Sequence, residues 1–138
     1  MWIYYVLAEI VIGALILIVS IKVLQSRKSA NGESITKDFA TAWQTLNADL
    51  ITKHLSPDFK YDSQWVYASL DYRGYIEYIR GKFTTIRKSK SEIEVRIVHV
   101  SETKGIIAIR QDKGEPAFYV IQIKNGKVTK GDLCMFIS

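Results

Sequence analysis

The side chains best suited to acid–base chemistry are the carboxylate of Asp62 and the imidazole of His99. A general acid–base mechanism needs a group that takes a proton and a donor that stabilises the charge that develops. Asp62 is the candidate for the first role, and His99 or Tyr78 for the second. These residues are weak catalytic candidates, and the main interpretation is non-enzymatic.

Other kinds of reactive centre find little support in the composition. With two histidines and one cysteine, the chain lacks the residues of a histidine or cysteine metal site, so we predict no metal. No histidine arrangement supports Cys134 as a nucleophile, so a structural role is expected for it. The sequence contains no phosphate loop, nucleotide fingerprint or nucleophile elbow, and we therefore predict no cofactor.

Aromatic residues are abundant, with eight Tyr, five Phe and three Trp. Many of them lie between residues 61 and 78, interleaved with polar side chains. They are consistent with ordinary core packing, or with an aromatic-lined pocket or protein interface. The predicted pocket residues are Trp43, Tyr61, Trp65, Tyr78 and His99.

Three helices and one strand are expected before residue 90. Apolar residues recur at helical spacing after a cap at Ser34 or Thr36, and a short second helix over 49–55 is stopped by Pro57. A strand follows over 59–65. Residues 71–88 again have an apolar face with helical spacing.

After Ser89 the apolar period changes from helical to two. Ile93, Val95, Ile97 and His99 are expected on one face of a strand. Three more strands follow over 105–111, 117–123 and 127–135, and Asn125-Gly126 is a strong hairpin signal. Helices followed by strands predict an α+β fold, with helices packed on one face of an antiparallel sheet.

The first 25 residues have a different character. Trp2–Leu24 reads as an almost continuous apolar run that would be about 34 Å long as a helix, enough to cross a bilayer core of roughly 30 Å. A signal peptide or a buried helix fits less well, because no basic segment precedes the run and the chain is small. We predict a transmembrane anchor over 1–25, a polar linker over 26–34 and a globular domain over 35–138.

The flanks of this run suggest its orientation and contacts. All nearby basic residues follow it, so the positive-inside rule places the globular domain in the cytoplasm. Glu9 within the run, with the small Gly13, suggests contact with another membrane helix, although a lone carboxyl group could instead reach the interface. The predicted interfacial residues are Trp2, Lys22, Arg27 and Lys28.

The charge from Glu33 onward comprises 16 basic and 13 acidic residues, a modest excess. Its diffuse distribution argues against a nucleic-acid partner. The basic residues after the apolar run would favour anionic lipid. The predicted partners are therefore membrane lipid and other membrane subunits or a second copy of the chain, with a small-molecule ligand possible.

Short stretches of the globular part resemble a known superfamily. The segments Trp43–Asp49 and Leu55–Phe59, then Tyr72-Arg73-Gly74-Tyr75 and Asn125–Val128, resemble in order and spacing the nuclear transport factor 2-like proteins, which include SnoaL-like and ketosteroid-isomerase-like members. The resemblance covers about residues 35–136. It implies a sheet curled around about three helices into a cone with an open pocket.

The resemblance also implies where catalytic groups would lie. The isomerases carry a base near the position of Ser63, one residue from Asp62, and a tyrosine near Ala42 or Trp43, where this chain has none. We therefore interpret the protein first as a membrane-anchored accessory or assembly subunit. A small-molecule binder or lyase/isomerase-type enzyme is the alternative, and a scaffold subunit of a secretion or conjugation system is a further one.

Overall fold

The computed structural model describes residues 31–135. The predicted anchor over 1–25, with Trp2, Glu9, Gly13, Lys22, and the flanking Arg27 and Lys28, lies outside the described residues. Among residues 31–135, no helix combines the length and apolar character that a membrane crossing requires.

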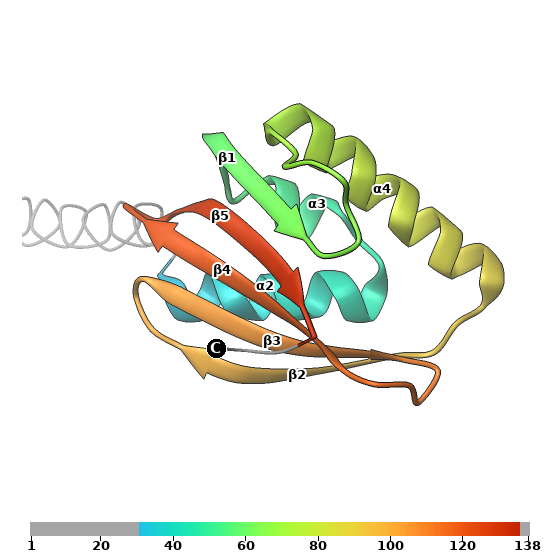
Figure 1. Cartoon of the computed structure of the whole chain (residues 1–138). Coiled ribbons are helices and arrows are strands. Elements are labelled where there is room, and N and C mark those ends of the chain that lie inside the picture. Colours follow the sequence, from blue (N-terminus) through green and yellow to red (C-terminus); the bar gives the residue numbers. More distant parts are fainter. Residues whose placement is uncertain (1–30, 136–138) are drawn as a thin grey trace, which may run out of the picture. The chain divides into compact units, whose positions relative to one another are not determined.

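Three helices and five strands make up the described part of the chain (Figure 1). In chain order they are α2 (Gly32–Thr45), α3 (Asp49–Thr52), β1 (Leu55–Ser63), α4 (Tyr72–Ser89), β2 (Ile93–Val100), β3 (Lys104–Gln111), β4 (Ala117–Lys124) and β5 (Lys127–Cys134). The α+β class and the order of elements expected from the sequence are confirmed.

Helix α2 begins earlier than the sequence pattern suggested, inside the predicted linker. Its cap is Asn31, whose side chain accepts a hydrogen bond from the Ser34 backbone N–H at 2.8 Å. The expected caps, Ser34 and Thr36, lie within the helix, and the Thr36 hydroxyl donates to the carbonyl of Gly32 at 2.7 Å. An asparagine satisfies free N–H groups at a helix start as well as serine does, so both positions were compatible with the sequence.

The sheet is mixed, which corrects the expected antiparallel arrangement. Its strand order is β1-β5-β4-β3-β2, and the last four strands form the expected antiparallel meander. Strand β1 pairs with β5 in parallel, with Tyr61 opposite Gly131. This pairing joins segments about 70 residues apart, so no local turn signal announces it.

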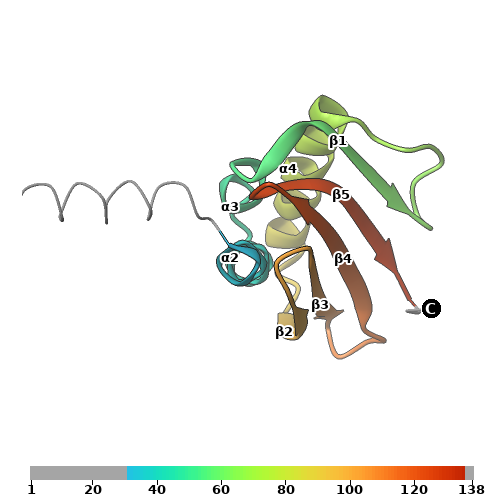
Figure 2. The ribbon, with the colours of Figure 1, turned by 90° about the vertical axis from the view of Figure 1, so that its left-hand side faces the viewer.

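All three described helices lie on the same face of the curved sheet (Figure 2). The core between the layers contains the apolar faces of α2 and α4 and the inward side chains of the strands. Its largest fully buried side chains include Phe39, Phe59, Tyr75, Phe83 and Tyr119. Of the aromatic residues between 61 and 78, Tyr61 and Tyr75 belong to this core, whereas Trp65 and Tyr67 are exposed.

The β4–β5 hairpin turns at Asn125-Gly126, as the sequence predicted. Both residues have positive φ, 52° and 72°. Asparagine and glycine tolerate this conformation, and it suits the twist of a two-residue hairpin. The turn therefore starts the pairing of the two strands, and a register shift between Gln122 and Ile123 precedes the pair of the inward residues Tyr119 and Leu133.

Candidate functional site

A cavity of about 240 Å³ lies between the helices and one end of the sheet. It is open to solvent on one side and is built from α2, α4, the strands β3 to β5 and the two loops at this end. Its lining residues are Trp43, Trp65, Lys82, Ile109, Gln111, Glu115, Ala117, Leu133 and Met135.

The apolar part of this lining comes from the concave side of the fold. Ile109 and Leu133 alternate with outward-facing residues on β3 and β5, and both are buried. Trp43, from the last turns of α2, is only 3% exposed. Its indole packs edge-on against Phe83 of α4, with ring centroids 4.9 Å apart. The cavity therefore has a rigid aromatic and aliphatic wall.

The indole N–H of Trp43 is buried and has no hydrogen-bond partner among the described residues. Most buried donors in proteins are paired, because leaving one unpaired costs about 1–3 kcal/mol. The aromatic rings of Phe83 and Tyr119 surround this indole and offer it no acceptor oxygen within reach. The described residues thus do not satisfy every polar group at this end of the fold.

Lys82 of α4 contributes the positive charge of the cavity. Its ammonium group lies 6.0 Å from the Trp43 ring centroid and 5.7 Å from that of Tyr78, within the range of a cation–π contact. Its one hydrogen bond among the described residues is a long one, 3.5 Å, to the Tyr78 hydroxyl. No ion pair of the described part of the chain includes Lys82.

The rim of the cavity is polar. The side-chain N–H of Gln111 donates a hydrogen bond to Ser91 Oγ at 3.0 Å, and the side-chain carbonyl oxygen of Gln111 takes no part in this bond. Glu115 lies in the β3–β4 loop and is exposed. Trp65 follows β1 and is 51% exposed, with its backbone N–H held by Ser63 Oγ at 3.0 Å. A ligand entering the cavity would therefore pass polar groups and the exposed side chain of Trp65 before it reaches Trp43.

A layer of tyrosines lies next to this wall, inside the core. Tyr61 stacks on Tyr75 and Tyr78 at ring-centroid distances of 4.6 and 5.5 Å, and Tyr119 donates a 2.6 Å hydrogen bond to the Tyr75 hydroxyl. A side chain on Gly131 would come within 2.7 Å of the Tyr119 hydroxyl, so glycine makes room for it.

Burial raises the pKa of the Tyr61, Tyr75 and Tyr119 hydroxyls above the ordinary value of 10, because the charged form would lose its hydration. They stay protonated at neutral pH. None of the three belongs to the cavity lining. Their hydroxyl groups therefore act as structural hydrogen-bonding groups of the core, which leaves Tyr78 as the tyrosine nearest to the cavity, through its contact with Lys82.

His99 does not face the interior, contrary to the phase expected from the sequence. Ile97 pairs with Ile107, but His99 pairs with Ile106, so Val98 is an extra residue that interrupts the β2–β3 register. Such a bulge turns the following side chains to the opposite face. His99 is exposed and lies outside the cavity lining.

Asp62 also lies away from the cavity. It alternates along β1 with the buried Tyr61, and strand geometry places it on the opposite face of the sheet. Strands β1 and β2 are the two edges of a five-stranded sheet, so Asp62 and His99 are separated by four strand spacings, about 19 Å along the sheet. The two weak catalytic candidates are thus not brought together.

Asp62 is instead part of a small acidic pair. It accepts a hydrogen bond from the Ser69 hydroxyl and lies opposite Asp132 in the β1–β5 register. Partial burial raises the pKa of Asp132, which Lys130 opposes and the neighbouring Asp62 charge reinforces. Within residues 31–135, no three acidic, histidine or cysteine side chains gather closely enough to hold a metal ion.

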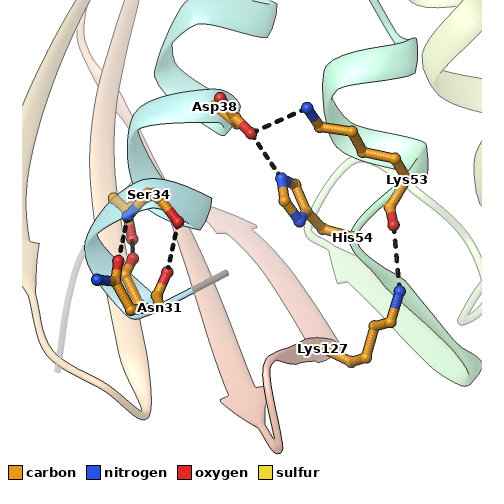
Figure 3. Close-up of polar contacts among 8 residues, drawn as sticks. Asn31, Ser34, Asp38, Lys53, His54 and Lys127 are labelled. Carbon is orange, nitrogen blue, oxygen red and sulfur yellow. Dashed lines mark hydrogen bonds and ion pairs between the residues drawn. The ribbon is translucent and has the colours of Figure 1, made fainter. Parts of the chain in front are cut away.

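A second polar cluster lies at the other half of α2, where it meets the segment after α3 (Figure 3). His54 Nε2 is 2.7 Å from Asp38 Oδ2, and Lys53 Nζ is 3.2 Å from the same oxygen. Partial burial works to raise the pKa of Asp38, but the hydrogen bonds and charges of His54 and Lys53 outweigh it and hold this pKa below its usual value. Lys127 closes the cluster by donating to the Lys53 carbonyl at 3.3 Å.

Of the five residues predicted for the pocket, the cavity lining includes Trp43 and Trp65. Tyr78 lies beside it through Lys82, Tyr61 lies in the core, and His99 is outside. Sequence reasoning missed Lys82. The sequence did contain a sign of it, because Lys82 lies three residues after the buried Ile79 and interrupts an apolar stripe of the helix with a charged side chain.

Comparison with known proteins identifies the fold. No protein-family model matches the sequence, and no curated protein matches it in sequence. Solved structures do match. A SnoaL-like protein of unknown function from Burkholderia thailandensis is 18% identical, with 74% of this chain and 91% of that chain covered and a TM-score of 0.61.

Two further structures agree with this match. An NTF2-like protein of unknown function from Cytophaga hutchinsonii is 15% identical, with 76% and 89% of the two chains covered and a TM-score of 0.55. A candidate polyketide cyclase from Sinorhizobium meliloti is 14% identical, with coverages of 72% and 93% and a TM-score of 0.52. The globular part of the chain therefore has the α+β cone fold of the SnoaL-like and NTF2-like proteins.

Proposed function

We propose that the cavity next to Trp43 binds a small, largely apolar molecule, and that this binding is the function of the globular domain. The observation that carries the proposal is the cavity itself, whose wall is the indole of Trp43 with Ile109 and Leu133. Ligand sites are typically concave and apolar, with a few polar groups at defined positions, and this cavity has that character.

The size of the cavity restricts the ligand. Its volume of about 240 Å³ is below the range of roughly 300–1,000 Å³ that drug-sized ligands occupy. A molecule with one or two rings, or an equivalent aliphatic body, is the expected occupant. The similarity to a candidate polyketide cyclase supports a small organic ligand over a purely assembly-related role, because that name describes a protein that acts on organic molecules.

We propose binding rather than a defined reaction. The titratable residues in the cavity lining are Lys82 and Glu115. The acid–base candidates drawn from the sequence, Asp62 and His99, lie outside it. A reaction would need a base positioned at a reacting atom, and the described side chains supply no such paired arrangement in the cavity.

A neutral probe tests this proposal. Cinnamyl alcohol has one ring and a short chain, which suits the cavity. When it is titrated into the full chain, we expect concentration-dependent, saturable shifts of the indole N–H resonances of Trp43 and Trp65. The variant Ala117→Phe fills the cavity from its wall and should abolish the shifts.

The matched control is Ala68→Phe, which adds the same ring at an exposed loop residue outside the lining. It should bind the alcohol like the parent protein. Saturable binding that survives Ala117→Phe, or indole resonances that do not respond to the probe, would contradict the proposal.

We also propose that residues 1–25 hold this domain at a membrane, with the domain on the cytoplasmic side. The support is the apolar run Trp2–Leu24 and the basic residues that follow it. The full chain should stay with the membrane fraction in alkaline carbonate, and a chain lacking residues 1–25 should not. Release of the full chain would contradict the anchor.

A further inference from the structure

Lys82 is an unusual feature of the cavity, because no carboxylate among the described residues forms an ion pair with it. The side chain is half-buried on the inner stripe of α4, between the buried Ile79 and Ile86. Most half-buried lysines extend their ammonium group to water or pair it with a carboxylate. Here the described residues give it two aromatic faces and one long hydrogen bond to Tyr78.

The acidic residue of the cavity lining, Glu115, does not pair with the Lys82 ammonium group. Glu115 also lines the cavity, but the ion pairs among the described residues do not include a Lys82–Glu115 contact within 4.0 Å. Glu115 is exposed in a loop, where water solvates its charge. Among the described residues that line the cavity, the ammonium group of Lys82 is therefore a charged donor without a carboxylate partner.

The surroundings of Lys82 would make an ionic contact stronger than one on the open surface. Trp43 and Leu133 reduce the access of water on one side, and charge-assisted hydrogen bonds gain strength where the local dielectric is low. The aromatic rings hold the ammonium group near the cavity at little further entropic cost when a ligand arrives.

We propose that the ligand of this cavity is a small carboxylic acid with an apolar, ring-bearing body, and that Lys82 binds its carboxylate. The body lies against Trp43 and Leu133, and the carboxylate lies at the mouth, where Lys82 reaches it. This inference rests on the proposed function, and it adds the chemical class of the ligand and the residue that selects it.

The test compares two probes that differ in one group. Cinnamate and cinnamyl alcohol share the same ring and chain, and only cinnamate carries a carboxylate. Each is titrated into the full chain at neutral pH and low salt, with the indole N–H resonances of Trp43 and Trp65 as the readout. We expect cinnamate to bind about tenfold more tightly than the alcohol.

Substitution of Lys82 identifies the group responsible. Lys82→Gln should remove most of the preference for cinnamate and leave the affinity for the alcohol within about twofold. Lys88→Gln, at an exposed position of the same helix, is the matched control and should keep the full preference. Lys82→Arg retains the charge and should also keep it, which provides a second variant if Lys82→Gln does not fold.

The outcomes separate the two proposals. If both probes bind equally well in the parent protein, or if Lys82→Gln keeps the preference for cinnamate, the carboxylate inference is wrong and the proposed small-molecule site stands. If neither probe moves the two indole resonances, the proposed site and this inference both fail. A preference that is lost in Lys82→Gln and retained in Lys88→Gln and Lys82→Arg supports the inference.

Discussion

Helix α2 contributes to two regions that differ in how well their polar groups are paired. Near its middle, the Asp38 carboxylate has two partners, His54 at 2.7 Å and Lys53 at 3.2 Å (Figure 3). Near its end, Trp43 lines a cavity, and among the described residues neither its buried N–H nor the ammonium group of Lys82 has a comparable partner. One helix therefore contributes both to a cluster whose polar groups are paired and to a cavity where polar groups lack such partners among the described residues.

The difference indicates what each region is for. A partly buried cluster whose polar groups are paired stabilises the fold, because its charges are compensated within the cluster. A region with unpaired polar groups beside open space gives up stability, and such sites commonly serve binding. The comparison predicts that substitutions in the first region change the free energy of unfolding most, and that substitutions in the second change it little.

The largest effect is expected for His54→Ala. His54 is 8% exposed, and its loss leaves the Asp38 carboxylate with Lys53 alone. We expect the free energy of unfolding, measured by urea denaturation at pH 7, to fall by about 2–3 kcal/mol. Lys53→Ala is the matched control, and should cost less than about 1 kcal/mol because the Lys53 side chain is 52% exposed. Equal losses in the two variants would contradict the ranking.

The next predictions concern how the stability contributions of two carboxylates, Asp38 and Asp132, change with pH. The pKa of Asp38 is lowered in the folded state, so its contribution to stability is present above pH 3.8, the ordinary pKa, and is lost as the pH falls through the folded value. Asp38→Asn should therefore lower stability by about 1 kcal/mol at pH 7 and have little effect in strong acid.

Asp132→Asn should act with the opposite sign. The pKa of Asp132 is raised in the folded state, so ionisation opposes folding once the pH exceeds 3.8. At pH 7 the substitution should raise the urea midpoint of unfolding slightly. This gain should disappear below pH 3.8, where Asp132 is protonated in both states. Parallel pH profiles for the two variants would show that the Asp38 and Asp132 carboxylates do not differ as described.

The smallest effect is expected for Trp43→Phe. The substitution removes a buried N–H that has no partner among the described residues, and it keeps an aromatic ring against Phe83. The lost packing and the relieved donor should largely cancel, so the free energy of unfolding should change by less than about 1 kcal/mol. A loss as large as that of His54→Ala, in the same urea experiment, would mean that Trp43 has a stabilising role and that the contrast between the two regions is wrong.

Local features of the fold could be predicted from the sequence, and non-local ones could not. The helical stripe of residues 71–88 and the Asn125-Gly126 turn depend on neighbouring residues and were found where expected. The parallel pairing of β1 with β5 depends on segments far apart in the chain. The Val98 bulge has no composition signal, and it reversed the face assigned to His99.

The candidate site was only partly predictable for the same reason. Trp43 and Trp65 line the cavity as expected for an aromatic-lined pocket, but the same expectation also selected Tyr61, which lies in the core. Lys82 was missed because a basic residue near a helical stripe is usually solvated, and its lack of a counter-charge becomes visible only when the packing around it is known.

The central claim is that the cavity beside Trp43 is a binding site for a small organic molecule. Intermolecular nuclear Overhauser effects between bound cinnamyl alcohol and the full chain test it most directly, because they report which protons lie within contact distance. The account predicts contacts from the phenyl ring to the methyl groups of Ala117 and Leu133. Contacts confined to residues of the outer sheet face, such as Val120, would contradict it.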